Sequence, residues 1–432
     1  MKSLKGTLQV PGDKSISHRA LIFAALSRGV CKVYGLSPAF DCVSSTDCLK
    51  QVGVQFERRT AADNGRREGA LLIKSPGLDG LTAPNSMLFA GNSGTTIRLL
   101  SGLLAGRPFR SELDGDDSLR RRPMSRVLKP LSSMGAKISY LQNENYPPFA
   151  IEGGNLQGTT FDLPQASAQV QTALLLAGLQ ADGRTVVKVP KPVRDHTSRM
   201  FKYIGVPFEA EGDTMVSVSR LENPIEPFTL DVPADISSAA FFMVAAACLP
   251  GSEILFTNLA LNPGRDLVLQ VLKEMGANIE IVDTRELCGE PIADILVTGG
   301  KLNGSALIEA DRLASGIDEI PVLALAAALS QGVLEVRDAA ELRVKESDRL
   351  AAIVNNLRAA GADLEESSDG FVVRGKGRLP GGSEWQALDD HRMAMTGLIA
   401  NLASDQSISV DNDLCVSVSY PDFVQDLKRL SH

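Results

Sequence analysis

Hydrophobic positions along the chain recur in a helical pattern that ends at a glycine. In five segments, apolar residues stand three or four positions apart before a glycine, and a short segment of alternating apolar residues follows. A glycine in this position is typical of the left-handed residue that ends many helices. The pattern therefore predicts a helix followed by a strand at each of five places: 48–57, 127–138, 200–211, 268–281 and 353–366.

A second pattern of hydrophobic positions is rich in alanine, leucine and serine and occurs six times, at intervals of roughly 70–80 residues. After their first turn these segments carry few charges, which predicts helices that are buried rather than half-exposed. Their small side chains permit close packing against other helices and against sheets. The six segments are 15–29, 94–106, 166–178, 237–251, 318–332 and 390–404.

Together the two patterns predict six α/β units, three in each of two domains. The last unit stops after 420–430, where a strand should follow, whereas the strand predicted at Leu4–Val10 lacks a preceding helix. We therefore expect the two chain ends to complete one unit, with the first strand in the C-terminal half. The chain would cross between the domains near Pro11–Asp13 and Val232–Asp235. The predicted domains are a continuous one, 13–232, and a discontinuous one, 1–12 plus 233–432.

Composition and charge narrow the class of protein. With 432 residues, 44% of them hydrophobic, the chain has ample core for about two or three domains. This composition excludes a disordered, collagen-like or disulfide-rich chain. The formal net charge of −8 argues against a general nucleic-acid binder. No apolar signal core opens the sequence, and the longest uncharged stretch, 163–181, contains glutamines and a glycine, so we expect no membrane span.

Cysteine and histidine usage points away from metal chemistry. The six cysteines form no Cys-x-x-Cys pair, so we interpret them as free thiols of a reducing cytosol. The four histidines stand far apart in sequence, which predicts no local transition-metal site and leaves open only one assembled from distant positions. We therefore expect a cytoplasmic protein that binds neither nucleic acid nor membrane.

Polar and charged motifs stand at the predicted starts of the small-residue helices. Although the chain is acidic, it holds 44 lysines and arginines, and several lie in these short Gly- and Ser-rich motifs. Helix N-termini present free N–H groups and partial positive charge, so motifs that converge in one cleft would bind phosphate and carboxylate without a metal. Each motif alone also fits a helix cap or solvated cations. The motifs are 13–19, 91–98, 167–169, 318–319 and 390–392.

The charged run 343–349 allows two interpretations. On a predicted helix, Lys345 and Arg349 form an i,i+4 pair of like charges, which is mildly destabilising in water, and Glu346 can pair with Arg349. The run is then either a solvated charged face or a site where a bound dianion offsets the cations. The arginines at 120–122, before Pro123, fit a solvated loop from which one side chain could reach a cleft.

Nine motifs, taken in chain order, resemble those of the 5-enolpyruvylshikimate-3-phosphate (EPSP) synthase family over essentially the whole chain. The resemblance implies an α/β fold: a two-domain inverted α/β barrel of six βαβαββ units, with the active site in the cleft between domains that close on substrate. It also implies transfer of the enolpyruvyl group of phosphoenolpyruvate to the 5-hydroxyl of shikimate 3-phosphate through a tetrahedral intermediate. The motifs are PGDKSISHRAL, LFAGNSGTTIRLL, RRRPM, SAQVQTALLLAGL, RDHT, DEIPVLA, LRVKESDRL, DDHRMAM and SYPDF.

The resemblance further implies roles for individual residues, with no metal and no cofactor, in a protein that we expect to be a monomer. Asp318 is the candidate base for the 5-hydroxyl. Glu346 is the candidate for protonating the methylene carbon, with Lys14 as the competitor. The residues implied around phosphoenolpyruvate are Lys14, Asn92, Gly94, Thr95, Arg98, Arg122, Gln169, Lys345, Arg349 and Arg392. Those implied around shikimate 3-phosphate are Lys14, Ser15, Arg19, Ser167, Ala168, Gln169, Arg194, Asp318 and Lys345.

The chain departs from the family's best-known enteric-bacterial and plant pattern. Ser93 stands where that pattern has alanine, Leu99 where it has proline, and Ala168 where it has the second of two serines. Residues 417–419 lack the lysine that the pattern places near phosphoenolpyruvate. The DHT, DEIPVLA and VKESDRL forms resemble a second class found in many other bacteria. Gly94 is kept, where an alanine would crowd phosphoenolpyruvate analogues such as glyphosate.

Two other functions would fit the same scaffold, and features of the sequence argue against each. UDP-N-acetylglucosamine enolpyruvyl transferase shares the implied fold and chemistry, but it needs a reactive cysteine near Arg120, and no cysteine lies between Cys48 and Cys248. A non-catalytic protein that binds a phosphorylated metabolite could use the same scaffold. The joint presence of Lys14, Asp318, Lys345 and Glu346 argues against that alternative.

Overall fold

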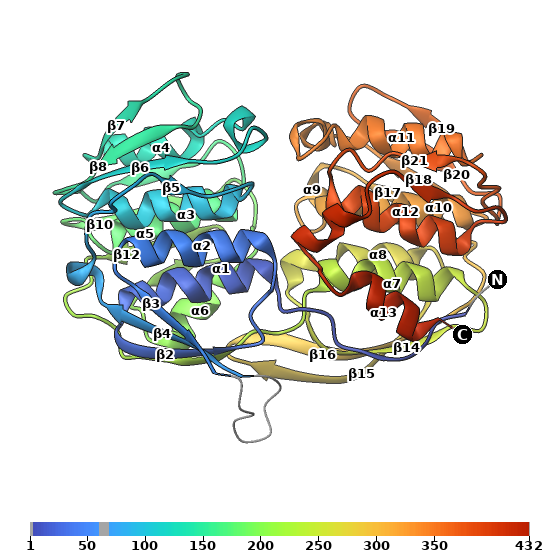
Figure 1. Cartoon of the computed structure of the whole chain (residues 1–432), viewed down its shortest axis with the longest axis horizontal. Coiled ribbons are helices and arrows are strands. Elements are labelled where there is room, and N and C mark those ends of the chain that lie inside the picture. Colours follow the sequence, from blue (N-terminus) through green and yellow to red (C-terminus); the bar gives the residue numbers. More distant parts are fainter. Residues whose placement is uncertain (1–2, 60–68, 432) are drawn as a thin grey trace. The chain divides into compact units, whose positions relative to one another are not determined.

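The computed structural model describes residues 3–59 and 69–431, and the chain divides into two compact units (Figure 1). The N-terminal unit consists of Gly12–Val232 together with the short segment Leu287–Glu290. The C-terminal unit consists of Met1–Pro11, Pro233–Glu286 and Pro291–His432. Both units are mixed α/β structures in which buried helices pack against small sheets.

The N-terminal unit repeats one arrangement of strands in three four-stranded sheets. In each sheet one parallel pair is followed by two antiparallel pairs. The first sheet has the order β13 (Thr229–Asp231), β2 (Arg28–Tyr34), β4 (Leu71–Pro76), β3 (Gln55–Arg58). The second has the order β5 (Leu88–Phe89), β6 (Arg110–Asp114), β8 (Phe149–Glu152), β7 (Lys137–Tyr140). The third, taken from its parallel pair, has the order β9 (Thr160–Asp162), β10 (Arg184–Lys188), β12 (Met215–Ser219), β11 (Glu209–Glu211).

Two kinds of helix fill the N-terminal unit. The small-residue helices are buried along almost their whole length, and α3 approaches α5 so closely that a Cβ on Gly102 would lie 2.1 Å from the carbonyl oxygen of Ala173. Only glycine fits at that crossing. The buried helices are α1 (Lys14–Phe23), α3 (Gly94–Ala105) and α5 (Ala168–Gly178). The partly exposed ones are α2 (Phe40–Gln51), α4 (Ser125–Ser133) and α6 (His196–Ile204).

The C-terminal unit likewise combines small sheets with buried and partly exposed helices. Its first four-stranded sheet has the order β1 (Lys5–Leu8), β14 (Glu253–Ala260), β16 (Glu290–Thr298), β15 (Asn278–Leu287). Its second has the order β17 (Ala306–Ile308), β18 (Val333–Val336), β20 (Phe371–Arg374), β19 (Asp363–Glu366). A third sheet pairs β21 (Glu384–Trp385) with β22 (Ser409–Val410). The buried helices are α7 (Ile236–Cys248), α10 (Ile320–Leu329) and α12 (His391–Ala403). The remaining helices are α8 (Leu267–Glu274), α9 (Ala310–Leu313), α11 (Arg349–Ala359) and α13 (Phe423–Leu430).

The two hydrophobic patterns in the sequence are confirmed as secondary structure. Each of the six small-residue segments contains a buried helix, and each of the five glycine-ended segments contains a helix and a strand. The glycines that end these five helices all have positive φ, as expected: Gly53, Gly135, Gly205, Gly276 and Gly361. Within the described residues, no helix combines the length and the apolar character that a membrane crossing needs.

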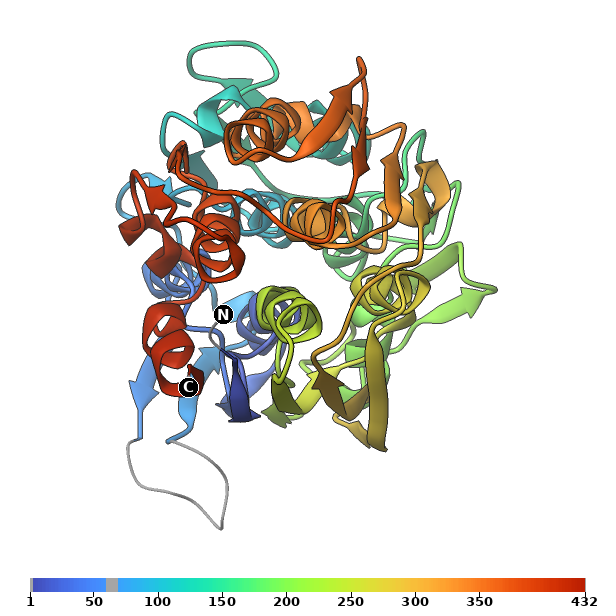
Figure 2. The same cartoon turned by 90° about the vertical axis from the view of Figure 1, so that its right-hand side faces the viewer.

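The first strand lies in the C-terminal unit, and its strand partner is far away in sequence. β1 pairs in parallel with β14 from Lys5 to Leu8, and the completion of one unit by the two chain ends stays a prediction. The contact of the first strand with the end of the chain includes a single bridge from Leu4 to Ser431 (Figures 1 and 2). In the other unit, β13 likewise pairs with the distant strand β2. The alternation of apolar residues in a short strand does not specify its neighbour, so the sequence could not distinguish these partners.

A buried histidine lies in the N-terminal unit. His18 on α1 is fully buried, and its Nδ1 is 2.8 Å from Oγ of Ser45 on α2. Burial penalises the charged imidazolium and lowers the pKa of His18 from 6.5 to about 4, although the negative charge of Asp41 opposes this. His18 therefore packs as a neutral side chain in the folded protein.

We expect the N-terminal unit to lose stability as the pH falls from 6.5 to about 4. Over this range His18 stays neutral in the folded chain, whereas in the unfolded chain it takes up a proton at its ordinary pKa. Because the folded pKa is the lower one, this contribution to the unfolding free energy is present above pH 6.5 and is lost on acidification, by about 3 kcal/mol. Urea unfolding of the wild type and His18→Gln across this range measures the effect. Equal pH slopes for the two proteins would contradict it.

Candidate active site

The starts of α1, α3 and α5 are fixed by capping side chains. Asp13, Ser93 and Ser167 each accept a hydrogen bond from a backbone N–H in the helical turn that follows, at 2.9, 3.1 and 3.4 Å. These caps satisfy N–H groups that a helix start otherwise leaves without a partner. The interpretation of Asp13 as a cap is confirmed. Ser167 also caps its helix, and its implied contact with shikimate 3-phosphate stays a prediction.

Gln169 joins the starts of α3 and α5. Its Oε1 accepts a hydrogen bond from Nη1 of Arg98 at 2.6 Å, and its Nε2 donates to Oγ1 of Thr95 at 2.8 Å. The Arg98 guanidinium is thereby held in place, which reduces the conformational entropy that it would lose on binding an anion. A Cβ on Gly94 would lie 2.8 Å from Nη1 of Arg98, so this glycine leaves the space that the guanidinium occupies.

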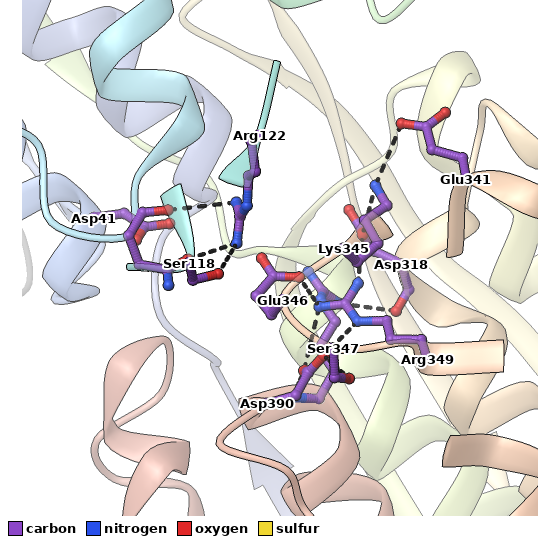
Figure 3. Close-up of polar contacts among 12 residues, drawn as sticks. Asp41, Ser118, Arg122, Asp318, Glu341, Lys345, Glu346, Ser347, Arg349 and Asp390 are labelled. Carbon is purple, nitrogen blue, oxygen red and sulfur yellow. Dashed lines mark hydrogen bonds and ion pairs between the residues drawn. The ribbon is translucent and has the colours of Figure 1, made fainter. Parts of the chain in front are cut away.

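Arg122 joins the same cluster from the three-arginine run. Its Nη2 donates to Oδ1 of Asn92 at 2.8 Å and to Oγ of Ser118 at 3.2 Å (Figure 3). Arg120 instead pairs with Asp114. The structure therefore selects Arg122 as the arginine of this run that lies beside the other predicted anion ligands of the N-terminal unit.

Arg19 connects three helices of this unit. Its guanidinium is almost fully buried, and it donates to the carbonyl oxygen of Ser15 and to the hydroxyls of Thr172 and Thr197 at 2.9–3.0 Å. These bonds tie α1 to α5 and α6. Arg19 thus has a structural role that the sequence did not indicate, and its implied contact with substrate stays a prediction.

Two other predicted cations lie in the N-terminal unit, Lys14 and Arg194. Nζ of Lys14, the first residue of α1, pairs with Oδ2 of Asp41 at 2.9 Å, and both side chains are partly exposed. Arg194 is half-buried on the loop before α6. Ala168 is the first residue of α5 and supplies no polar side chain.

Arg349 is the centre of a second cluster, in the C-terminal unit (Figure 3). The side chain is 1% exposed and forms ion pairs with Asp318, Glu346 and Asp390 at 2.9, 2.6 and 2.7 Å. Burial alone would lower the pKa of Arg349, but the three carboxylates outweigh burial and raise it. Burial likewise opposes ionisation of Asp390, and the positive charge of Arg349 nevertheless holds the pKa of Asp390 below its usual range.

The prediction that 343–349 forms one helix is wrong. A 3-10 helix ends at Val344, Lys345 is extended, and α11 begins at Arg349, where Asp348 caps the N–H of Ala351 at 3.0 Å. Lys345 and Arg349 are therefore not an i,i+4 helical pair. The physical reason is that Asp348 makes a good N-cap and starts the helix later than expected.

The two cations converge on Asp318 instead. Oδ1 of Asp318 is 3.5 Å from Nζ of Lys345 and 2.9 Å from Nη1 of Arg349. Nη1 of Arg392 donates to the main-chain oxygen of Asp318 at 3.2 Å and lies 3.5 Å from Glu319. A bound dianion is thus not needed to offset Lys345 and Arg349, because a carboxylate of the chain already does so.

The acidic partners of the predicted cations are the residues that the sequence analysis did not identify. Asp390 and Glu319 stand in recognised motifs, and both are almost fully buried, but Asp390 was interpreted only as a helix cap and Glu319 was given no role of its own. Their charge next to cation-rich motifs is a signal that could have identified them, since buried carboxylates are nearly always paired. Asp41, the partner of Lys14, lies in the first turn of α2 outside every motif, and no sequence signal marks it.

The described part of the chain offers no evident metal centre. Across residues 3–59 and 69–431, no group of three or more histidine, cysteine, aspartate or glutamate side chains is arranged to hold a metal ion. The carboxylates around Arg349 are instead engaged by arginine and lysine. Guanidinium and ammonium groups held in this way are suited to binding carboxylates and phosphates.

We expect Asp390→Ala to lower the unfolding free energy by about 3 kcal/mol, because it removes one partner of a buried ion pair. Chemical denaturation measures the loss. Glu365→Ala is a matched control, since it removes the partner of Arg374 in an exposed pair, and it should change the free energy by less than about 0.5 kcal/mol. Equal effects of the two substitutions would contradict the central role of Arg349.

Known proteins resemble this chain over its whole length. The sequence matches the EPSP synthase (3-phosphoshikimate 1-carboxyvinyltransferase) family over residues 1–427. A 3-phosphoshikimate 1-carboxyvinyltransferase of Oceanobacillus iheyensis is 44% identical over 428 residues, which cover 99% of this chain and 97% of the relative. One of the same name from Synechococcus sp. (strain RCC307) is 46% identical over 434 residues, with 99% and 97% covered.

Solved structures agree with these sequence matches. An EPSP synthase of Acinetobacter baumannii superposes with a TM-score of 0.87 at 40% identity, over 99% of this chain and 96% of that one. The enolpyruvyl transferase NikO of Streptomyces tendae has a TM-score of 0.77 over 99% of this chain and 95% of its own, but at 17% identity it shows the fold alone. With the predicted anion ligands gathered at helix starts and around Arg349, these full-length matches show that the chain belongs to the EPSP synthase family.

Proposed function

We propose that this chain transfers the enolpyruvyl group of phosphoenolpyruvate to the 5-hydroxyl of shikimate 3-phosphate and releases phosphate. It would act as a 3-phosphoshikimate 1-carboxyvinyltransferase of the shikimate pathway, which leads to chorismate and the aromatic amino acids. The observation that carries the proposal is the family match over residues 1–427. The site supports it, because both substrates are anions and the two clusters present cations already held by neighbouring groups.

The reaction needs an acid and a base as well as cations. The 5-hydroxyl oxygen attacks C2 of phosphoenolpyruvate, the carbon that carries the phosphate group, and loses its proton, while the methylene carbon gains a proton and becomes a methyl group. The tetrahedral adduct then loses phosphate, and a proton leaves the methyl group to restore the double bond. Proton transfer at both places is work for positioned side chains at neutral pH.

Asp318 is the proposed base for the 5-hydroxyl. Lys345 and Arg349 hold its carboxylate from one side at 3.5 and 2.9 Å, and Arg392 holds its main-chain oxygen. A base fixed in this way loses little conformational entropy when the substrate hydroxyl arrives. The cations would at the same time stabilise charge that develops on phosphoenolpyruvate.

The acid that protonates the methylene carbon is proposed to be Glu346, with Lys14 as the competitor. Oε2 of Glu346 is 2.6 Å from Nη2 of Arg349, and Nζ of Lys14 is 2.9 Å from Asp41. Each candidate thus has an ionic partner that would be rearranged when anionic substrates bind.

The proposed binding sites combine both clusters. In this proposal the units form inverted α/β barrels of six βαβαββ repeats that close on substrate, with the site in the cleft between them. The repeated parallel and antiparallel order of the sheets supports the repeats. The proposed phosphoenolpyruvate ligands are Lys14, Asn92, Gly94, Thr95, Arg98, Arg122, Gln169, Lys345, Arg349 and Arg392. The proposed shikimate 3-phosphate ligands are Lys14, Ser15, Arg19, Ser167, Ala168, Gln169, Arg194, Asp318 and Lys345.

The alternative acceptor, UDP-N-acetylglucosamine, has less support. Burial raises the thiol pKa of Cys48 to about 12, with the nearby charge of Asp47 adding to the effect, and burial raises that of Cys248 to about 12. Cys48 and Cys248 are the cysteines nearest in sequence on either side of Arg120, near which that enzyme needs a reactive thiol. A thiol with a raised pKa is a poor nucleophile. Because the free cysteines also fit a reducing compartment, we propose a cytoplasmic location, and we propose that the protein is a monomer.

The wild type should release phosphate from shikimate 3-phosphate plus phosphoenolpyruvate, and not from phosphoenolpyruvate plus UDP-N-acetylglucosamine. Asp318→Ala and Lys14→Met should each lower kcat by orders of magnitude while the protein stays folded, because each removes a group that acts on substrate. Lys50→Met is the matched control, since Lys50 forms an exposed pair with Asp47. No phosphate release by the wild type would sink the proposed function, and near-normal turnover of either variant would sink that residue's assignment.

Deuterium incorporation separates Glu346 from Lys14. In heavy water with both substrates, reversible protonation of the methylene carbon places deuterium in recovered phosphoenolpyruvate, which NMR detects. If Glu346 is the acid, Glu346→Gln should lower this incorporation by at least about a hundredfold, within the range for loss of an acid catalyst. Incorporation that persists in Glu346→Gln and disappears in Lys14→Met would assign the proton to Lys14 instead.

A further inference from the structure

The turn between β15 and β16 packs against a loop that carries a predicted substrate ligand. Cys288 and Gly289 form the turn with positive φ values of 52° and 83°, as in tight β-hairpins (Figure 1). The strands on either side belong mainly to the C-terminal unit, whereas Leu287–Glu290 belongs to the N-terminal unit. The turn is therefore a part of the N-terminal unit that the hairpin of the other unit supplies.

Glu290, at the end of this turn, forms a buried pair with His196. Both side chains are 1% exposed, and Oε1 of Glu290 is 2.8 Å from Nδ1 of His196. Glutamate is rarely buried to this extent without such a partner, and loss of the partner leaves a polar group without its hydrogen bond. His196 is the first residue of α6 and follows Arg194 by two positions.

Arg199 provides a second connection between the turn and the same loop. Its Nε donates to Oδ1 of Asp195 at 2.8 Å, and its Nη1 donates to the carbonyl oxygen of Gly289 at 3.4 Å. A Cβ on Gly289 would lie 3.2 Å from the carbonyl oxygen of Arg199, so the turn is in close contact with α6. Asp195 is the residue directly after Arg194.

The start of α6 is also bonded to the helices that carry other predicted ligands. Oγ1 of Thr197 accepts from Nε of Arg19 at 2.9 Å and lies 2.7 Å from Oγ1 of Thr172 on α5. These bonds hold the start of α6 on α1 and α5 without Glu290, so loss of the Glu290–His196 pair would loosen the preceding loop and leave these helices in place. The Glu290–His196 pair lies directly at the first turn of α6.

We propose that Glu290 is a positioning residue for shikimate 3-phosphate. Through His196 it fixes the start of α6 and the loop before it, which carries Arg194. The inference rests on the proposed function, because it requires Arg194 to bind that substrate. Without Glu290 the loop still forms, but Arg194 occupies more positions, and binding must select the competent one at a cost in affinity.

Glu290→Ala tests this role, with Glu286→Ala as the matched control, since Glu286 is an exposed glutamate on the same hairpin. We expect Glu290→Ala to raise the KM for shikimate 3-phosphate by about tenfold, because one charge-assisted hydrogen bond is lost. The Kd of shikimate 3-phosphate, measured by calorimetry without phosphoenolpyruvate, should rise by the same factor. The KM for phosphoenolpyruvate and kcat should stay within about twofold of the wild type. The control should leave every value unchanged.

Glu290→Gln keeps the inference testable if the alanine variant does not fold. Its amide oxygen still accepts from His196 but forms a weaker bond, so we expect a rise of about threefold in the KM for shikimate 3-phosphate. A rise below about twofold in the folded variant, or an equal rise for both substrates, overturns the positioning role. If the wild type is active, such a result leaves the proposed function intact. A wild type that releases no phosphate overturns both.

Discussion

The close packing of the small-residue helices is the constraint on which the predicted site depends. These helices are buried along nearly their whole length, and where α3 meets α5 the backbone leaves no room for a Cβ at Gly102. An interior packed to this density largely confines polar side chains to the helix ends. There they cap the helix, as Asp13, Ser93 and Asp390 do, or lie beside free N–H groups. The predicted anion ligands are therefore concentrated near these ends, where the packing leaves space for polar side chains.

The cations of the predicted site are balanced by acidic side chains of the same chain. Arg349 has three carboxylate partners, Lys14 has Asp41, and Lys345 shares Asp318 with Arg349. Within each unit, cations paired in this way are held in defined positions, whereas unpaired cations would be freer to move. If the proposed ligands bind substrate, the anion competes with these carboxylates. Binding would then be an exchange of ionic partners more than a capture of unpaired charge.

Much of this architecture could be predicted from the sequence, because the spacing of apolar residues and the positions of glycines are local signals. The six buried helices and the left-handed glycines, such as Gly205, follow from residues within one helical turn. The helix break before Arg349 was missed, although Asp348 is a recognisable cap. Asp41 could not have been found, because only the packing of α2 beside α1 brings it to Lys14. The motifs supplied the predicted cations, but not their acidic partners.

The pairing of β1 with β14 has a consequence for synthesis on the ribosome. The first strand to be made waits for a partner that follows nearly the whole N-terminal unit, since Leu4 bonds to Ser252 across 248 positions. By then β13 has emerged and can complete the sheet of β2. Domains generally fold in the order of their synthesis, and distant pairings are slow. β1 therefore stays unpaired while residues 9–252 are synthesised, and it can join its sheet only once β14 has emerged.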